Sequence, residues 1–287
     1  MRRLPPSSVE RTSGRAPGPR PLREAELSRV ESVYTDVDGT LTTGHKLRSQ
    51  TIRALEQLSE AGLRLVLVSG RPAGWGEAWA RTLPVEGVIV ENGGLCFVRG
   101  ANGALRRVYA EAPAERAANR KRLRSEVLRV LRKVPGARLS SDSASTEVDL
   151  AIDYNEEARL GDAAAGRIEA LLRARGVTAV RSSVHVNCWL GRFDKLSMAR
   201  RFAREAWGER LMPEDGRSVY AGDSFNDAPM FQAFALSVGV ANVRGVLDRI
   251  DAPPAFITRA AEGRGFEELA RAILAQRGRR PLFRSDS

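Results

Sequence analysis

Two aspartates one residue apart follow a short apolar segment near the start of the chain. They are Asp36 and Asp38, in the segment VYTDVDGTLT that runs from Val33 to Thr42. Carboxylates this close repel each other unless a cation lies between them or the turn is open to water. The pair therefore indicates a cation site or an exposed acidic turn, and other residues must decide between the two.

A second acidic segment and a hydroxyl group follow two other apolar segments. Asp223 and Asp227 lie in VYAGDSFNDAPM, and Ser69 comes directly after RLVLV. In open parallel sheets, ligands bind beyond the carboxyl ends of the strands, so we expect these side chains to meet at one edge. Four carboxylates there predict a bound divalent cation, and Mg²⁺ suits a site of few carboxylates, waters and substrate phosphate oxygens.

The spacing excludes an EF-hand calcium loop at this acidic pair. Counted from Asp36, such a loop needs glycine at the sixth position and glutamate at the twelfth. Those positions hold Leu41 and Leu47.

Lys195 stands out because the chain uses arginine for most of its cations. Only four of the 46 basic residues are lysines. A helix is expected to begin near Lys195, and a helix start disfavours a cation but favours a phosphate that a lysine could help to hold. A solvated lysine and a phosphate-binding lysine both remain open from the composition alone.

Alternating strands and helices are expected to position these residues. Continuous apolar strands are predicted at Val33–Val37, Arg64–Val68 and Gly87–Val90, with a helix over residues 49–61 between the first two. This alternation is typical of an α/β parallel sheet that is covered on both faces. A Rossmann-like arrangement is the fold class that we expect.

The regular alternation of predicted strands and helices is interrupted between about residues 97 and 190. The pattern there predicts a hairpin at 95–110, an Arg-rich helix at about 112–134, a strand at 147–154, a helix at 162–175 and two strands within 178–190. The alternation of strands and helices resumes at Asp194. We therefore expect a basic disordered tail over residues 1–29, a core built from 30–96 and 191–277, an inserted α/β cap over 97–190, and a second basic tail over 278–287.

The motifs together resemble the haloacid dehalogenase superfamily of phosphatases. The resemblance rests on DVDGT, on Ser69 after an apolar strand, on Lys195, and on GDSFND, in this order along residues 32–276. SGRP, ENGG and FDK are similar to the branch of this superfamily, called type IIB, whose α/β cap lies between the second and third motifs. Cof-type sugar-phosphate phosphatases, mannosyl-3-phosphoglycerate phosphatases and sucrose-phosphatases belong to that branch.

The resemblance implies roles for the carboxylates. Asp36 would be the nucleophile that forms an aspartyl-phosphate, and Asp38 would be the general acid and then the base. Asp223 would bind Mg²⁺ together with Asp36 and the main-chain carbonyl of Asp38. Asp227 would be a further metal ligand or would support one.

The resemblance also implies a phosphate-binding set and a substrate class. Ser69 and Lys195 would hold the phosphoryl oxygens, Asn226 would orient Lys195 or the phosphate, and Arg71 would face the substrate or stabilise a turn. The substrate is expected to be a small phosphorylated metabolite, namely a sugar phosphate. Residues of the cap would select the leaving group, and the candidates are His185, Asn187 and Asp153.

Charge and cysteine content limit the partners and the compartment. The net charge is +11, but residues 1–29 carry seven Arg against three Glu and residues 277–287 carry four Arg against one Asp. The two tails thus contribute +4 and +3 to the net charge of +11. The rest of the chain is only weakly basic, so nucleic acid is not the partner that we expect. No apolar run is long enough to span a membrane. The two cysteines, Cys96 and Cys188, lie in apolar stretches, which favours a cytoplasmic protein with reduced thiols.

Two other functions remain open at this point. A phosphotransferase or phosphomutase would use the same aspartyl-phosphate. A basic binding protein on a scaffold that has lost catalysis is the alternative from another class, and the intact acid pair argues against it.

Overall fold

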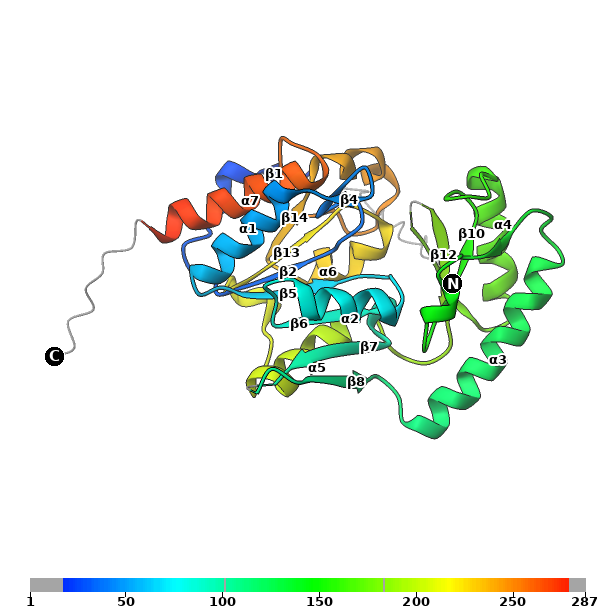
Figure 1. Cartoon of the computed structure of the whole chain (residues 1–287). Helices are drawn as coiled ribbons and strands as arrows, with labels where there is room; N and C mark the ends of the chain where they lie inside the picture. The colour runs from blue at the N-terminus through cyan, green and yellow to red at the C-terminus, as the bar shows by residue number, and fades with distance from the viewer. Residues whose placement is uncertain (1–17, 101, 183, 279–287) are drawn as a thin grey trace, which may run out of the picture.

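The structure is a computed structural model that describes residues 18–100, 102–182 and 184–278. Within these residues the largest sheet has nine strands, in the order β1-β15-β14-β13-β2-β5-β6-β7-β8 (Figure 1). Their bounds are β1 Arg20–Pro21, β2 Ser32–Thr35, β5 Arg64–Val68, β6 Gly87–Val90, β7 Leu95–Arg99, β8 Leu105–Tyr109, β13 Ser218–Gly222, β14 Leu236–Gly239 and β15 Phe256–Ile257. The strands from β1 to β6 in this order pair in parallel, and β7 and β8 add an antiparallel edge. The expected α/β class is confirmed.

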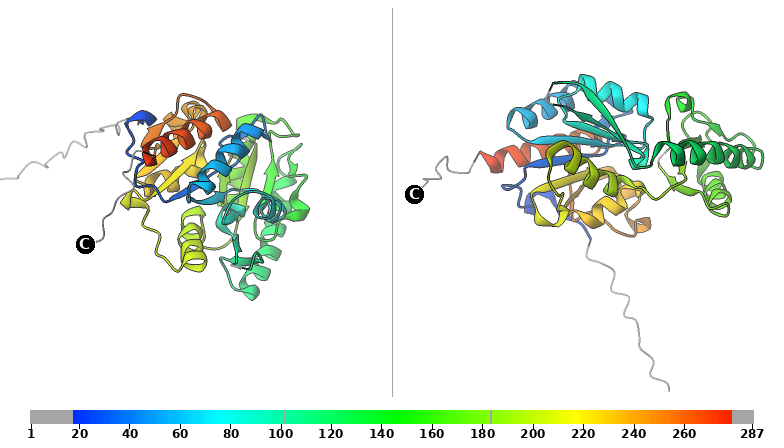
Figure 2. Two further views of the ribbon diagram at one scale, coloured as in Figure 1. Left: turned by 60° about the vertical axis from the view of Figure 1, so that its left-hand side comes forward. Right: turned by 90° about the horizontal axis from the view of Figure 1, so that it is seen from below.

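Helices cover both faces of this sheet, as the views in Figures 1 and 2 show. One apolar cluster contains residues of α1 (Ser49–Glu60), α2 (Ala73–Thr82) and α7 (Glu262–Arg277), and the other contains residues of α5 (Lys195–Trp207) and α6 (Ala228–Ala233). Along β5, Leu65 and Leu67 belong to the first cluster, whereas Val66 and Val68 belong to the second. The central strands are apolar without interruption because both of their faces are buried.

A smaller antiparallel sheet lies to one side of the large one (Figure 1). Its order is β11-β12-β10-β9, with bounds β9 Arg138–Leu139, β10 Leu150–Asp153, β11 Thr178–Arg181 and β12 His185–Trp189. Helices α3 (Pro113–Leu131) and α4 (Gly161–Arg173) pack on it and complete a separate apolar cluster. A two-stranded ribbon of β3 (Thr42–Thr43) and β4 (Lys46–Leu47) follows the first acidic motif.

The hairpin expected inside the inserted cap belongs to the large sheet instead. β7 pairs with β6 and β8 pairs with β7, so the expected boundary between residues 96 and 97 falls inside β7. The amphipathic pattern identified the hairpin but did not show which sheet it would join. We propose that the inserted unit begins after β8 and ends before α5, and we call it the cap below.

Part of the expected N-terminal tail is ordered. Arg20 and Pro21 form β1 at the edge of the sheet, where a proline is tolerated because one side of an edge strand needs no partner. Leu22 and Leu27 are buried, and the backbone N–H of Leu27 donates to Gln276 in α7. The expectation of disorder was therefore wrong for residues 18–29, since these leucines provide an apolar face. Residues 1–17 and 279–287 lie outside the described part.

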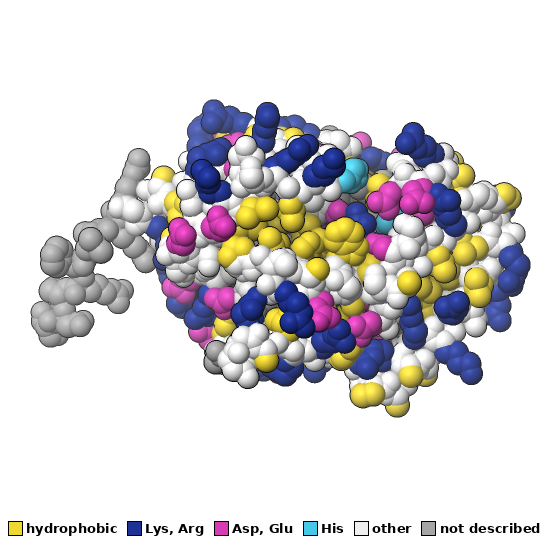
Figure 3. All heavy atoms as spheres, in the orientation of Figure 1, with side chains coloured by type: hydrophobic (Ala, Val, Ile, Leu, Met, Phe, Trp, Pro, Cys, Tyr) yellow, Lys and Arg dark blue, Asp and Glu magenta, His cyan; other side chains and the backbone are white. Residues whose placement is uncertain are grey.

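The visible surface carries basic and acidic side chains in mixture. On the face drawn in Figure 3, Lys and Arg side chains are spread over the molecule and interspersed with Asp and Glu rather than gathered in one stripe. No helix among the described residues is long and apolar enough to cross a membrane.

Candidate active site

The carboxyl ends of three neighbouring parallel strands carry the expected site residues. β13 pairs with β2, and β2 pairs with β5. Asp36 follows β2, Ser69 follows β5, and Asp223 follows β13. The fold thus starts all three side chains from the same edge of the sheet.

Three carboxylates meet at this edge. Asp36, Asp223 and Asp227 each offer an oxygen, and these oxygens lie within 4.8 Å of one another. Asp36 is 4% exposed and Asp227 is fully buried. Burial raises the pKa of Asp36 to about 8, although the nearby Lys195 lowers it, and burial also raises the pKa of Asp223 well above its ordinary value. The ionised form of this cluster is therefore unfavourable without a nearby cation.

Lys195, the first residue of α5, supplies one cation to this cluster. Its position is fixed because the side chain of Asp194 accepts from the backbone N–H of Ser197 in a capping box. The Lys195 Nζ lies 2.9 Å from Asp36 Oδ1 and 2.7 Å from Asp227 Oδ1. Burial disfavours the ammonium form, but the attraction of Asp227 and Asp36 outweighs it and raises the pKa of Lys195.

Both oxygens of Asp227 already accept hydrogen bonds from the protein. Oδ1 accepts from the Lys195 ammonium and from the Tyr220 hydroxyl. Oδ2 accepts from the backbone N–H groups of Asp223 and Ser224, at 3.0 and 3.1 Å. At least two donors per oxygen engage the lone pairs of this carboxylate. The contacts of Asp227 therefore favour a role in orienting its neighbours over a role as a metal ligand.

Asp223 has the opposite character and fits a divalent cation. Its Oδ2 accepts from Asn242 Nδ2 at 2.8 Å, whereas its Oδ1 is buried and has no hydrogen-bond partner among the described residues. Gly39 has φ of 78°, and a Cβ there would lie 2.3 Å from Asp223 Oδ2, so only glycine fits beside this carboxylate. A buried carboxylate oxygen without a donor, close to a second buried carboxylate, suits a hard cation such as Mg²⁺.

The bond between Tyr220 and Asp227 makes a testable contribution. We expect Tyr220→Phe to lower the free energy of unfolding by about 1 to 3 kcal/mol, because Asp227 loses one donor to a charged oxygen. Tyr34 provides a matched control, since it is equally buried in the adjacent strand and its hydroxyl has no partner among the described residues. Urea denaturation of both variants measures this, and equal destabilisation by Tyr34→Phe would contradict the assignment.

Asp38 is held by an arginine from the neighbouring loop. Arg71 Nε lies 2.8 Å from Asp38 Oδ2, and Arg71 Nη2 lies 2.9 Å from Asp38 Oδ1. The backbone N–H of Arg71 donates to Ser69 Oγ at 3.0 Å. The guanidinium therefore forms a bidentate ion pair, which fixes the orientation of Asp38 at the site.

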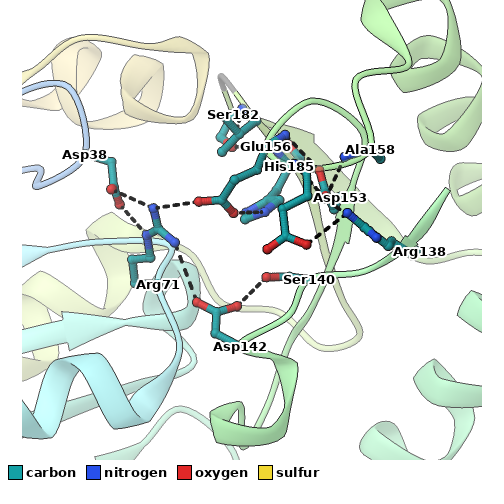
Figure 4. A network of polar contacts seen from close by, with 12 residues as sticks. Asp38, Arg71, Arg138, Ser140, Asp142, Asp153, Glu156, Ala158, Ser182 and His185 are labelled. Carbon is teal, nitrogen blue, oxygen red and sulfur yellow. Dashed lines mark hydrogen bonds and ion pairs between the residues drawn. The ribbon is translucent and has the colours of Figure 1, made fainter. Parts of the chain in front are cut away.

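Two carboxylates of the cap approach the same guanidinium. Arg71 Nη1 lies 3.6 Å from Asp142 Oδ2, and Arg71 Nη2 lies 3.8 Å from Glu156 Oε1. Figure 4 shows Arg71 between Asp38 on the side of the large sheet and these two acids on the side of the cap. Arg71 thus links the site to the cap.

A cavity of about 510 Å³, including its open mouth, lies over the carboxylates. Asp36, Asp38, Ser69, Arg71 and Asn226 line it from the large sheet. The cap contributes the side chains of Asp142, Ser182, His185 and Asn187. The expected site residues thus line the cavity on one side, and polar residues of the cap line it on the other.

One residue considered for substrate contact lies elsewhere. Asp153 does not line the cavity and instead accepts hydrogen bonds from three backbone N–H groups of the following turn.

Several residues at the site were not anticipated from the sequence. Asn242 follows β14, so the rule that ligands lie beyond strand ends would have found it if applied to that strand. Tyr220 carried no signal because a strand tyrosine usually indicates packing. Asp142 and Glu156 lie in irregular segments, where no periodicity marks them.

Comparison with known proteins places these observations in context. The sequence profile described as haloacid dehalogenase-like hydrolase matches residues 33–111. A phosphoglycolate phosphatase of Methanoculleus marisnigri is 27% identical over 223 residues, which cover 74% of this chain and 85% of the relative. A phosphoglycolate phosphatase of Methanosarcina acetivorans is 28% identical over 244 residues, which cover 84% and 95%.

Solved structures show the same fold. A Thermoplasma acidophilum protein superposes with a TM-score of 0.63 at 18% identity and covers 85% of this chain and 98% of its own. The sucrose-phosphatase of Synechocystis superposes with a TM-score of 0.60 at 14% identity and covers 86% and 98%. The similarity therefore extends over both sheets.

Proposed function

We propose that this chain is a phosphatase of the haloacid dehalogenase-like hydrolases and that it hydrolyses a small phosphate monoester through a phosphoryl group carried on Asp36. The observation that carries this proposal is the meeting of Asp36, Asp223 and Lys195 next to a cavity that residues of the cap also line. The named activities of the relatives, on phosphoglycolate and on sucrose phosphate, are consistent with a small substrate.

The reaction has two steps on this chain. A carboxylate oxygen of Asp36 attacks phosphorus, the bond to the leaving oxygen breaks, and that oxygen takes a proton from Asp38. A water then gives its proton to Asp38 and attacks the phosphoryl group, which releases phosphate and restores the Asp36 carboxylate. Arg71 holds Asp38 by two hydrogen bonds and so fixes the orientation of this carboxyl group.

A divalent cation, Mg²⁺ in this proposal, would be held by Asp36, by the unpartnered oxygen of Asp223 and by the main-chain carbonyl of Asp38. When bound, it would offset the negative charge of the phosphoryl oxygens next to the nucleophile. Asp227 was expected as a ligand as well, but its five donors favour a positioning role for it.

Ser69 and Asn226, which line the cavity, and Lys195, which lies next to Asp36, would bind the phosphoryl group. Ser69 offers a hydroxyl and Lys195 an ammonium, and fixed donors of this kind contribute most in the transition state. Asn226 lines the cavity, and its Oδ1 accepts from Ser224 Oγ at 2.6 Å, which orients its amide.

Both cysteines are free and buried, which supports the proposal of a reducing, cytoplasmic location.

A phosphatase screen tests this function. We expect purified protein to release inorganic phosphate from a panel of small phosphate esters with Mg²⁺ and to stop when EDTA is added in excess. Transfer of the phosphoryl group to a second sugar, without release of phosphate, would instead favour the phosphotransferase alternative. No turnover of any ester with Mg²⁺ would reject both.

A further inference from the structure

We propose that the cap wall of the cavity selects phosphate esters with an uncharged, hydroxyl-bearing leaving group and rejects those whose leaving group carries a carboxylate. This inference rests on the proposed function and names the residues that determine its specificity. They are His185 and Asp142, which line the cavity, and Glu156, which contacts the lining residues Arg71 and His185.

The charges around Arg71 support the exclusion of anions. Arg71 is the only Lys or Arg among the described residues that line the cavity. Its guanidinium is already paired with Asp38 at 2.8 Å and faces Asp142 and Glu156 at 3.6 and 3.8 Å. A carboxylate on the leaving group would therefore find no free cation on the cap side and would be repelled by two like charges.

His185 presents its imidazole to the cavity. The residue is 6% exposed and lines the cavity. Its Nε2 lies 2.8 Å from Glu156 Oε2, so the two side chains form a polar pair. Asn187, two residues further along β12, lines the same cavity. A carboxylate accepts hydrogen bonds from hydroxyl groups, and the imidazole adds a second hydrogen-bonding group beside it.

Glu156 is held in place by Asp153. The Asp153 carboxylate accepts from the backbone N–H groups of Glu156, Glu157 and Ala158, at 2.8, 3.0 and 3.1 Å. These bonds fix the turn that directs Glu156 toward Arg71 and His185 (Figure 4). Asp153 is therefore a positioning residue, although the sequence suggested direct contact with substrate.

The inference predicts a substrate preference that differs from the one in the names of the phosphoglycolate phosphatases compared above. In phosphoglycolate the carbon attached to the ester oxygen carries a carboxylate, and in 2-hydroxyethyl phosphate the same carbon carries a hydroxymethyl group instead. The two esters are close in size and differ chiefly in the charge of the leaving group. We expect the wild-type protein to show a kcat/KM at least tenfold higher for 2-hydroxyethyl phosphate than for phosphoglycolate.

Variants of neighbouring glutamates give the matched test. Glu156→Gln is expected to raise the kcat/KM for phosphoglycolate, relative to 2-hydroxyethyl phosphate, about tenfold, and Asp142→Asn is expected to shift the ratio in the same direction. Glu157→Gln removes the same charge one residue away, where the side chain is 52% exposed and pairs with Arg138, and should leave the ratio unchanged.

The outcomes are distinguishable. A wild-type preference for phosphoglycolate, or a ratio that neither Glu156→Gln nor Asp142→Asn changes, would overturn the inference while the phosphatase function stands. A ratio that Glu157→Gln changes as much as Glu156→Gln would show a general charge effect and would also overturn it. Failure to release phosphate from either ester, and from an aryl phosphate, with Mg²⁺ would reject the proposed function and this inference with it.

Discussion

The Asp36→Asn variant is expected to lose phosphatase activity by a factor on the order of 10⁴ or more, the size of effect seen when a covalent nucleophile is removed. An amide of the same shape cannot attack phosphorus, so no phosphoryl group would be carried on residue 36. Steady-state release of phosphate from a good substrate with Mg²⁺ measures this. Retention of more than a tenth of the activity would remove Asp36 from the role of nucleophile.

The same variant should fold at least as stably as the wild type when no metal is added. Asp36 has its pKa raised from 3.8 to about 8, chiefly by burial, so the folded metal-free protein binds this proton more tightly than the unfolded chain does. Stability then falls as the pH rises between these values, because the ionised carboxylate is less favourable in the folded state. Asp36→Asn removes this effect, so its advantage over the wild type should grow from pH 4 to pH 8.

Asp251→Asn is the control for both measurements. Asp251 is exposed and lies outside the cavity over Asp36. This variant should keep the activity of the wild type and show no pH-dependent gain in stability. A gain as large as that of Asp36→Asn would mean that the effect reflects net charge and not the buried cluster.

Lys195→Met is expected to lower the free energy of unfolding by about 3 to 5 kcal/mol, as removal of one partner from a buried ion pair does. Its ammonium contacts Asp36 and Asp227 at 2.9 and 2.7 Å, and all three side chains are buried. Without it, two carboxylates remain in a region that water does not reach. We also expect kcat to fall by about 10² to 10³, because a fixed donor to the phosphoryl oxygens is lost.

Lys46→Met provides the matched control for this prediction. Lys46 is one of the four lysines and is exposed in β4. Urea denaturation and steady-state kinetics of the two variants should separate them clearly. Added Mg²⁺ should restore part of the stability of Lys195→Met, since a second cation then offsets the same carboxylates. Equal stability of the two variants would contradict the account of the cluster.

The sequence was sufficient for the parts of the molecule that follow strong local patterns. Continuous apolar strands bounded by Gly or Ser predicted β5 and β6 with their observed ends. The rule that ligands lie beyond strand ends brought Asp36, Ser69 and Asp223 to one edge, as the structure shows. These predictions succeeded because each depends on a few adjacent residues.

The parts that were missed depend on partners distant in sequence. β7 and β8 belong to the large sheet because β7 pairs with β6, and no feature of the hairpin itself determines that. Asp153 was expected in the cavity, but its side chain turns to backbone N–H groups a few residues later. No structural role was predicted for Glu91, which follows β6.

Glu91 illustrates why such roles escape sequence analysis. Its buried carboxylate accepts from the backbone N–H groups of Ala73, Glu147, Val148 and Asp149, and so joins the large sheet to the segment that enters β10. These donors are main-chain groups, so no residue type in the sequence reveals the contact. The role becomes visible only when the two segments are placed together in space.

A crystal structure with Mg²⁺ and beryllium trifluoride, which mimics a phosphoryl group on a carboxylate, tests the central claim most directly. The account predicts beryllium bonded to an oxygen of Asp36, with the fluorine atoms contacted by Ser69 and Lys195 and the metal ion on Asp223. Beryllium bonded to a different residue, or an unmodified Asp36 with the metal ion bound away from Asp223, would contradict it.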